Sequence, residues 1–491
     1  MKNLLFIGVD QMRFDSVGPH KVLPTDTPAL DKLIAGGVSF PRSYATCPLC
    51  TPARASMFTG DYAFRHGMGT NCDMYHALGT ELAEPERLLN HDLAAAGYRC
   101  GFVGKWHVGV TKGPADYGFE GDVPAGYGNL TTTAAFKTYL ADHDLSYRVE
   151  PTLYFNPDRQ TMAGGRWHGP AASTPSSFQT EQAIAMLKDF AAGDRPFYLT
   201  VQYWDPHGPH LICDEFWQHT DRAAIAPWAN FADDLSTKPV RVRRERDDFY
   251  RRHPRTVEDL VDYIGLYCDH VAMLDAQIGR LHAALDEIGL VDDTLVVFTS
   301  DHGDMTGAHG GLIDKGLPYE EAMRVPLVFS HPSLGPGERD GLALNMDILP
   351  TALSLLGVGF EPRHGRDLAA EVRDPGSPGR EYLLAEYHGL RFLYSQRILV
   401  SQDGWKYVFS PGDDDELYDL TADPHEMTNL APTPEAAETL ARLRAALMAE
   451  TARFDDPLRD CVAKFNGQWR TGSGQFDATS AYLTDPAPDG A

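Results

Sequence analysis

Residues 4–11 read Leu-Leu-Phe-Ile-Gly-Val-Asp-Gln, a short apolar run that ends in two polar side chains. A run of this length, rich in large and β-branched residues, predicts a buried strand. Similar runs lie at 99–103, 197–204, 294–300 and 325–330, with longer helix-like segments between them. Strands that alternate with helices predict an α/β fold, a large and mostly parallel sheet sandwiched by helices.

The clearest helix follows Thr256. Apolar residues recur there at spacings of three and four from 260 to 288, which places them on one stripe. We expect this stripe to pack on the sheet.

Polar side chains follow four of the predicted strands at the point where each strand ends. In open α/β sheets, ligands bind outside the carboxyl ends of the strands. The sequence therefore predicts one site at this edge. The polar clusters are 10–11, 105–107, 205–207 and 301–302.

The pattern changes after a Pro- and Gly-rich stretch at 374–379. Beyond it we predict paired strands at 397–401 and 404–409, a turn at 412–415 and an amphipathic helix at 434–454. The predicted organisation is a large α/β domain at 1–374, a smaller C-terminal α+β domain at 375–466 and a C-terminal extension at 467–491.

Composition limits the partners and the compartment. The 491 residues include 43 Lys and Arg against 69 Asp and Glu, a net charge of −26 that argues against nucleic-acid or anionic-membrane partners. Seven cysteines are too few for a disulfide framework. The apolar run at the start is shorter than a signal peptide requires, and we expect a cytoplasmic protein with no membrane partner.

The motif that carries the chemistry is Cys50-Thr51-Pro52-Ala53-Arg54, followed by Thr59-Gly60. It resembles the sulfatase signature, in which the cysteine is oxidised to formylglycine after translation. The resemblance covers most of the chain. It extends to Asp10, 104–107, 301–303, Gly307, His309, Lys315, 324–326, 347–351 and 417–420.

The resemblance implies an alkaline-phosphatase-like fold and the hydrolysis of sulfate monoesters to an alcohol and inorganic sulfate. The hydrated aldehyde made from Cys50 would be the nucleophile, because it offers one hydroxyl for attack and a second to release the product. One divalent metal ion, Ca²⁺ or Mn²⁺, and a formylglycine-generating enzyme are also implied. The substrate would be a small-molecule or saccharide sulfate ester.

Carried over position by position, the resemblance gives each candidate residue a role. Arg54 would hold the formylglycine hydroxyl, His107 would be the base and His207 the donor to the ester oxygen, with His210 as a competitor. Lys105 and Lys315 would bind the sulfate oxygens, and Asn71 is a further substrate contact. The metal set is Asp10, Gln11, Cys50, Asp301 and His302, with Asp304 and His309 outside it.

Two positions depart from the usual sulfatase pattern. Gln11 and His302 stand where a second Asp and an Asn are usual, and both resemble phosphonate monoester hydrolases. Phosphonate monoester or phosphodiester hydrolysis is therefore the alternative activity. An imidazole ligand favours Mn²⁺, whereas oxygen ligands alone favour Ca²⁺.

Three further interpretations remain open. An unconverted Cys50 would leave a non-catalytic metal- and anion-binding protein. Cys47 and Cys50 also form a C-x-x-C pair typical of redox or zinc sites, although no second Cys or His pair stands at zinc spacing. The basic segment 241–255 is either a solvated helix or a rim that attracts polyanionic substrates.

Two loops, 117–127 and 155–168, are expected to line the pocket for the leaving group. The extension at 467–491 is a candidate contact for a homo-oligomer.

Overall fold

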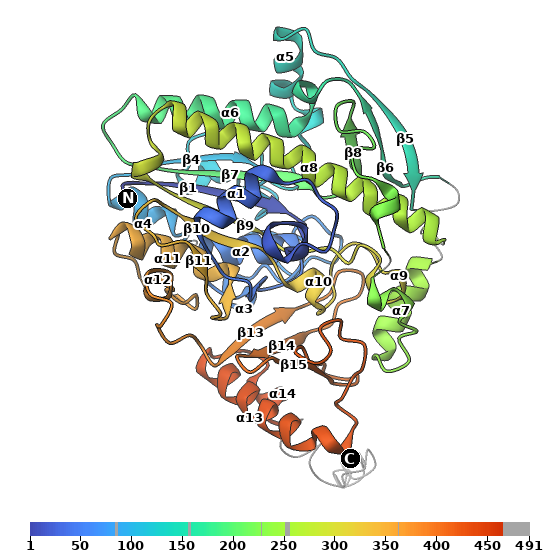
Figure 1. Ribbon diagram of the computed structural model, residues 1–491. Helices are drawn as coiled ribbons and strands as arrows, with labels where there is room; N and C mark the ends of the chain where they lie inside the picture. Colours follow the sequence, from blue (N-terminus) through green and yellow to red (C-terminus); the bar gives the residue numbers. More distant parts are fainter. Residues whose placement is uncertain (84–86, 156–158, 227, 251–255, 362, 465–491) are drawn as a thin grey trace, which may run out of the picture.

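A computed structural model shows one large sheet between layers of helices, with a second sheet toward the C-terminus (Figure 1). The structure describes residues 1–83, 87–155, 159–226, 228–250, 256–361 and 363–464. The large sheet has seven strands in the order β11-β2-β10-β9-β1-β7-β4.

Four parallel strands make up one side of this sheet and reach its edge. They are β4 (Arg99–Gly104), β7 (Phe197–Pro206), β1 (Asn3–Asp10) and β9 (Thr294–Ser300). Each coincides closely with a predicted apolar run, and every residue of β1 is buried. All four end at the same edge, which therefore gathers the polar residues that follow them.

The predicted strand at 325–330 is β10 (Leu327–Ser330), and it runs antiparallel to β9. Short strands β2 (Val38–Ser39) and β11 (Gly337–Glu338) complete that side. The sheet is thus mostly parallel, as predicted, with a mixed edge.

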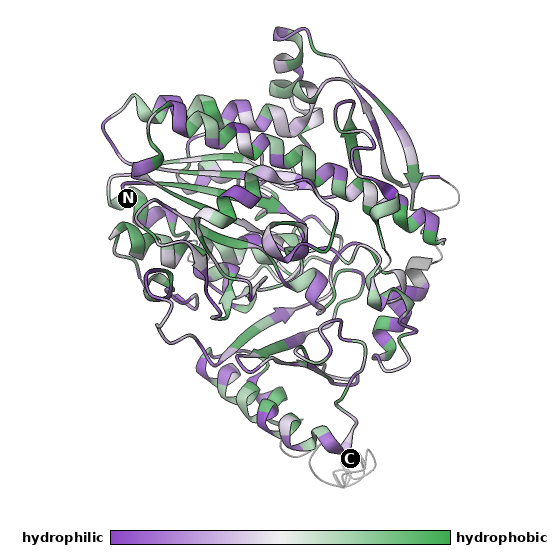
Figure 2. Cartoon of the chain, in the orientation of Figure 1, coloured by the Kyte–Doolittle hydropathy of each residue, from purple (hydrophilic) through white to green (hydrophobic). Residues whose placement is uncertain are grey.

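Alternate side chains of β1 enter two different cores. Leu5 and Ile7 belong to a core with α1 (Pro28–Gly36), α6 (Pro175–Ala191) and α8 (Val257–Glu287). Leu4 and Phe6 pack on the opposite face. The helices of that face are α2 (Cys50–Thr59), α4 (Asn90–Ala95) and α11 (Ile348–Leu356). Burial on both faces explains why the central strands are apolar throughout (Figure 2).

Helix α8 confirms the predicted stripe. Its first turn is fixed by a capping box, in which the Thr256 hydroxyl accepts from the Asp259 N–H and the Asp259 carboxylate accepts from the Thr256 N–H. Leu260, Ile264 and Leu274 are buried in the core beneath it.

A three-stranded sheet lies beside the large one. It consists of β5 (Arg148–Tyr154), β6 (Met162–His168) and β8 (His210–Cys213), with α5 (Ala134–Asp142) next to it in Figure 1. Sequence analysis treated 155–168 as loop, but its second half forms β6. The alternation of that segment is interrupted by Gly164 and Gly165, which hides the strand pattern.

The C-terminal part is an antiparallel sheet backed by helices. Its strands are β13 (Tyr382–Tyr387), β14 (Gln396–Ser401), β15 (Trp405–Phe409) and β16 (Glu416–Asp419), and its helices are α13 (Ala437–Arg453) and α14 (Arg459–Lys464). Its core also includes Tyr44, Cys47 and Leu49, which directly precede Cys50 in sequence. The boundary at 374/375 falls between α12 (Ala369–Arg373) and β13 and stays a prediction, and 467–491 lies outside the described residues.

Short elements complete the described chain. They are β3 (Ser43–Tyr44), β12 (Ala343–Leu344), α3 (Ala63–His66), α7 (Val240–Tyr250), α9 (Ala308–Gly311) and α10 (Glu320–Met323). Among the described helices, none has the length and apolar content needed to cross a bilayer.

Candidate active site

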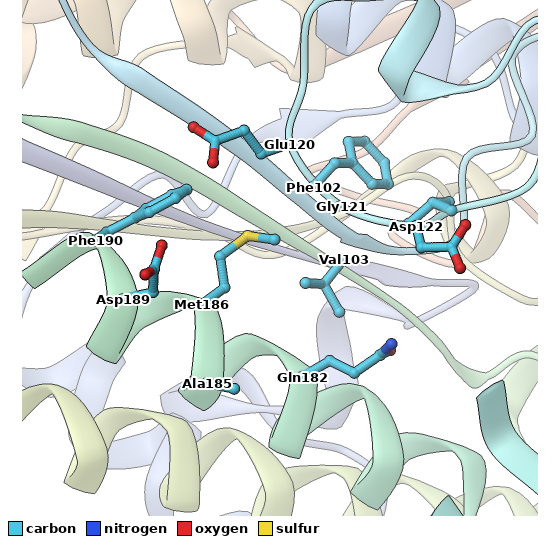
Figure 3. Close-up of a pocket in the computed structure, with 11 residues that line it drawn as sticks. Phe102, Val103, Glu120, Gly121, Asp122, Gln182, Ala185, Met186, Asp189 and Phe190 are labelled. Carbon is cyan, nitrogen blue, oxygen red and sulfur yellow. The ribbon is translucent and has the colours of Figure 1, made fainter. Parts of the chain in front are cut away.

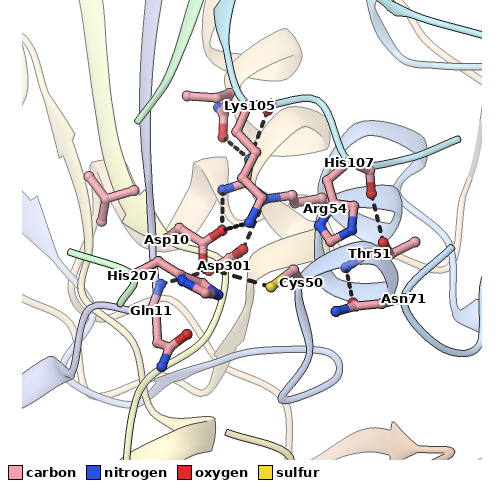
Figure 4. Close-up of polar contacts among 12 residues, drawn as sticks. Asp10, Gln11, Cys50, Thr51, Arg54, Asn71, Lys105, His107, His207 and Asp301 are labelled. Atoms are coloured by element: carbon pink, nitrogen blue, oxygen red, sulfur yellow. Dashed lines mark hydrogen bonds and ion pairs between the residues drawn. The ribbon is translucent and has the colours of Figure 1, made fainter. Parts of the chain in front are cut away.

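The carboxyl edge of the parallel strands brings together the polar residues that sequence analysis placed there (Figure 4). Asp10 ends β1, Lys105 follows β4 and Asp301 follows β9. Lys105 Nζ forms an ion pair with Asp10, and both side chains are fully buried. Four strands distant in sequence therefore supply one site.

Cys50 is the first residue of α2 and is fully buried. Its Sγ lies 3.2 Å from His302 Nε2 and 3.8 Å from Asp10 Oδ1. The next residue holds the helix start in place, because the Thr51 N–H donates to Asn71 Oδ1 at 3.0 Å and the Thr51 hydroxyl donates to the His107 carbonyl at 2.8 Å. Asn71 thus supports the turn that carries Cys50.

Arg54 lies one turn further along α2 and is fully buried. Its Nε donates to Asp301 Oδ2 at 2.9 Å and its Nη2 to Asp10 Oδ2 at 3.3 Å. Its Nη1 lies 3.1 Å from the Lys105 carbonyl and 3.2 Å from Gln202 Oε1. In this arrangement Arg54 orients the two carboxylates rather than the Cys50 side chain.

Four side chains converge on one point. Donor atoms of Asp10, Cys50, Asp301 and His302 all lie within 4.8 Å of one another, and all four residues are buried. Burial raises the pKa of Asp301, and the neighbouring Asp10 raises it further. Burial lowers the pKa of His302, but Asp301 and Cys50 outweigh it and raise the value to about 9. The cluster therefore concentrates negative charge, and two carboxylates, a sulfur and an imidazole fit a divalent cation.

Gln11 lies beside this cluster, but its amide points elsewhere. Its Oε1 accepts from Lys315 Nζ at 2.9 Å, and its Nε2 donates to Asp304 and, at 3.2 Å, to Asp314. Its φ of 67° is in the left-handed region, which re-aims the side chain at the end of β1. The structure therefore places the Gln11 amide between Lys315 on one side and the carboxylates of Asp304 and Asp314 on the other.

Two lysines and His207 surround the open side of the cluster. Lys315 Nζ lies 2.6 Å from His207 Nε2. Lys105 Nζ lies 4.6 Å from the ring centroid of Tyr127 and 4.4 Å from that of Trp204. Cations at these positions suit a sulfate or phosphate group whose charge is spread over several oxygens.

His107 is buried and has a φ of 54°. Its Nε2 lies 3.1 Å from Asp73 Oδ1, while its Nδ1 has no hydrogen-bond partner. Burial lowers the pKa of His107, but Asp73 and Cys50 raise it to about 9. A histidine oriented by a carboxylate is suited to proton transfer.

A pocket of about 370 Å³ opens beside the site. Tyr127, Trp204 and His207 line its inner end, and the two predicted loops contribute Tyr127, Met162 and Trp167. His210 is buried, with its Nδ1 3.2 Å from His270 Nδ1, and does not line the pocket. His207 therefore faces both Lys315 and the pocket.

Several residues at the site are not singled out by the sequence, although Tyr127 belongs to the loop 117–127 that is expected to line the pocket. Asp73, Tyr127, Gln202 and Trp204 come from a turn, a loop and the middle and end of β7. The third strand end did point to 205–207, and the residue before that cluster is Trp204. Only the folded arrangement shows which of these ordinary residues reach the lysines.

The remaining predicted features lie apart from the site. Cys47 belongs to the core under the C-terminal sheet and is outside the donor cluster that contains Cys50. Arg241 lies 3.6 Å from Asp413 and 3.9 Å from Glu416 in ion pairs, and 251–255 lie outside the described residues. A second cavity of about 430 Å³ lies between β4 and α6 (Figure 3), and none of the predicted site residues lines it.

Comparisons with known proteins identify the family and the fold. The sulfatase family profile matches residues 2–358, and the profile "N-sulphoglucosamine sulphohydrolase, C-terminal" matches 307–453. Choline-sulfatase of Rhizobium meliloti is 29% identical over 94% of this chain and 88% of its own length. The multifunctional alkaline phosphatase superfamily protein PehA of Trinickia caryophylli is 28% identical over 89% and 92%. A phosphonate monoester hydrolase from Silicibacter pomeroyi shares the fold, with a TM-score of 0.77, 24% identity, and coverage of 93% and 97%.

Proposed function

This chain belongs to the sulfatase family and is a sulfuric ester hydrolase, and from that premise we propose that formylglycine made from Cys50 is its nucleophile. The observation that carries the proposal is the convergence of Cys50 with Asp10, Asp301 and His302 between Lys105 and Lys315. A hydrated aldehyde at this position would supply the two hydroxyls that attack and product release require.

A divalent ion held by Asp10, Asp301 and His302 would lower the pKa of a coordinated hydroxyl and offset charge on the substrate. The donor set, two carboxylates and an imidazole, favours Mn²⁺ over Ca²⁺. Arg54 keeps both carboxylates aimed at the cluster through its bonds to Asp10 and Asp301.

The chain's own residues would carry out the remaining steps. Lys105 and Lys315 bind sulfate oxygens and hold the ester sulfur opposite the nucleophile. His107, oriented by Asp73, takes the proton of the second hydroxyl as sulfate is released. His207 lies at the inner end of the pocket, where it donates a proton to the ester oxygen as the alcohol leaves.

His207 is placed for this donation by its neighbours. Its Nδ1 is 2.6 Å from the Gly208 carbonyl, so Nδ1 carries a proton that fixes the ring orientation. Its Nε2 then faces Lys315 Nζ at 2.6 Å. An ester oxygen that takes the place of this contact would receive a proton that originates on the Lys315 ammonium and passes through His207 Nε2.

A phosphonate monoester or phosphodiester is the second candidate substrate class. The observation that favours it is the pair Gln11 and His302, two positions at which this chain resembles phosphonate monoester hydrolases. An aryl sulfate, a phosphonate monoester and a phosphodiester, assayed as kcat/KM on the same Mn²⁺-loaded preparation, separate the two. We expect the sulfate to be preferred. A phosphonate that exceeds every sulfate would reverse the assignment.

Mass spectrometry of the peptide that contains Cys50 tests the nucleophile. Protein coexpressed with a formylglycine-generating enzyme is expected to carry the aldehyde at Cys50, with Cys72 in an adjacent stretch unmodified as the internal control. A free thiol at Cys50 in such protein would support the non-catalytic metal- and anion-binding alternative.

A further inference from the structure

The pocket beside the site has a chemistry that selects the leaving group. Resting on the proposed function, we propose that the substrate is the sulfate ester of an uncharged, ring-bearing and largely apolar alcohol. Sulfates of sugars that carry a second sulfate or carboxylate would be poor substrates. Three features of the pocket support this proposal: the place where it begins, the residues that line it, and the ion pairs that its charged neighbours already form.

The pocket begins where the ester oxygen must lie. Tyr127, Trp204 and His207 line it, and the first two rings also flank Lys105. The Tyr127 and Trp204 ring centroids are 4.3 Å apart in an edge-to-face contact, and Tyr127 lies 6.2 Å from the His207 ring. A sulfate between the lysines would therefore direct its alcohol past these rings into the pocket.

The walls of the pocket are largely aromatic and apolar, beside the polar side chains of Asn129, Thr131, Thr174, Ser176 and His270. Tyr147 and Trp167 stack with centroids 3.7 Å apart and planes 13° apart. Flat aromatic surfaces of this kind favour contact with a ring, and the volume of about 370 Å³ is in the range of small-molecule sites. The apolar members of the lining are Leu130, Val149, Met162, Pro175, Pro209, Leu211 and Met273.

No lysine or arginine occurs among the described residues that line the pocket. Its carboxylate, Asp205, already accepts from the Ser176 hydroxyl and lies 3.2 Å from His270 Nε2. A second anionic group would lose its water without gaining a cationic partner. Burial of an unpaired charge is strongly unfavourable, so the pocket disfavours polyanionic leaving groups.

The nearby cations cannot compensate. Lys105 is paired with Asp10, and Lys315 contacts Gln11 and His207, so both belong to the sulfate end. On the basic segment, Arg241 is paired with acidic groups of the C-terminal part. Arg241 and the exposed Arg244 line a different pocket, and none of the described arginines of this segment lines the pocket beside the site.

The test compares three sulfate esters on the converted, Mn²⁺-loaded protein. We expect kcat/KM for 2-naphthyl sulfate to exceed that for a disulfated glucosamine about 100-fold, since unpaired buried groups discriminate at least this strongly. A larger kcat/KM for the disulfated sugar, or for a quaternary-ammonium alkyl sulfate, would overturn the proposal.

Variants assign the selectivity to the pocket. Leu211→Lys adds a cation to the pocket wall. It is expected to lower the ratio of kcat/KM for 2-naphthyl sulfate to kcat/KM for the disulfated sugar at least tenfold. Tyr147→Ala removes one stacking face and should raise KM for the naphthyl ester without a comparable change for the sugar. Met186→Lys, in the second cavity of Figure 3, is the matched control and should leave the ratio unchanged. An equal effect of Leu211→Lys and Met186→Lys would contradict the assignment.

Binding of the free alcohol separates this proposal from the catalytic one. 2-Naphthol should quench tryptophan fluorescence with a weaker affinity in Tyr147→Ala, whether or not Cys50 is converted. If 2-naphthol binds but the converted protein hydrolyses no sulfate ester, the proposed nucleophile is contradicted while the proposed role of the pocket is supported. If the converted protein hydrolyses sulfate esters but 2-naphthol does not bind in the pocket, only the proposed role of the pocket is contradicted.

Discussion

Two buried charged clusters lie in this molecule, and they are built in opposite ways. Around Cys50, acidic donors face one another: Asp10 and Asp301 share a point with the sulfur. The second group, which we name the junction cluster, contains His309, Glu321, Glu426 and Lys406 between the large sheet and the C-terminal sheet. It also places three donor atoms within 4.8 Å.

In the junction cluster, opposite charges alternate. Lys406 Nζ lies 2.8 Å from Glu426 Oε1, His309 Nδ1 lies 3.0 Å from Asp233, and His309 Nε2 lies 3.6 Å from Glu321. Each charge already has a partner within the protein. Alternation serves the attachment of one part to another, whereas convergence of like charges creates a demand for a ligand.

The largest expected effect separates the two clusters by activity. Cys50→Ala and Asp301→Asn should each lower kcat by about 10³-fold or more, because nucleophile and metal ligand act as a unit. Cys50→Ala should not lower the melting temperature of the metal-free protein. Asp301→Asn removes repulsion with Asp10 but also takes a charged partner from Arg54, so its effect on the melting temperature should be small. Initial rates with an aryl sulfate and thermal melts check this. Retained activity in Cys50→Ala would contradict the role of Cys50.

The junction cluster should respond in the reverse way. Glu426→Gln takes from the buried Lys406 one of its two carboxylate partners, because Glu320 Oε1 also lies 3.2 Å from Lys406 Nζ. The expected loss in the free energy of unfolding is about 1–3 kcal/mol. The kcat of the folded fraction should stay within a few-fold of the original. Urea unfolding and active-site titration measure the two quantities. A loss of kcat without a loss of stability would place this cluster in the catalytic machinery.

Metal content sharpens the comparison further. Because the donor atoms of Asp10, Cys50, Asp301 and His302 converge on one point and the two carboxylates share Arg54 as a partner, we expect one Mn²⁺ per chain. Asp10→Asn should abolish its binding, while Glu321→Gln should not. At a hundredfold excess over Kd, the ion should add about 2.7 kcal/mol to stability. Elemental analysis after gel filtration gives the stoichiometry, and two ions per chain would show that the junction cluster also binds one.

The smallest expected effect is a pH dependence of stability from the junction cluster. Burial raises the pKa of Glu321, but His309 and Arg13 outweigh it and hold that pKa well below its usual range. Its contribution is therefore present above ~4.3, the ordinary pKa of Glu, and is lost as pH falls below it. In Glu321→Gln, the free energy of unfolding should fall less between pH 5 and pH 3 than in the original protein, by on the order of 1–2 kcal/mol. Urea titrations at several pH values check this.

His309 contributes with the opposite sign. Burial lowers its pKa, but Glu321 and Asp233 raise it overall. The contribution is full below ~6.5, the ordinary pKa of His, and is lost as pH rises through the raised value. If His309→Gln has the same fall in the free energy of unfolding above pH ~6.5 as the original protein, His309 is neutral over the whole pH range measured.

The sequence predicted the parts of the fold that follow from local pattern. The four parallel strands, α8 and the shared carboxyl edge all come from apolar periodicity and from polar residues such as Asp10 and Asp301 at strand ends. The apolar pattern does not predict that β10 is antiparallel, because the direction of a strand depends on how the chain connects it to its neighbours in the fold. The same limit hid β6 behind its two glycines.

The candidate site divides in a similar way. Cys50, Lys105, Lys315 and His302 carry chemistry in their residue type, so a motif can propose them. The direction of the Gln11 amide depends on a left-handed backbone and on three partners far away in sequence. Asp73 and Trp204 are ordinary residues until the fold places them against His107 and Lys105.

The burial of Cys50 bears on whether its modification would come before or after the chain folds. Its side chain has no solvent exposure, and the residues before it are packed beneath the C-terminal sheet. A modifying enzyme that must grip the chain on both sides of Cys50 can do so only before that sheet closes over it. Under the proposed function, oxidation of Cys50 would therefore have to precede the closure of the C-terminal sheet, and protein that folds with its thiol intact would stay unconverted.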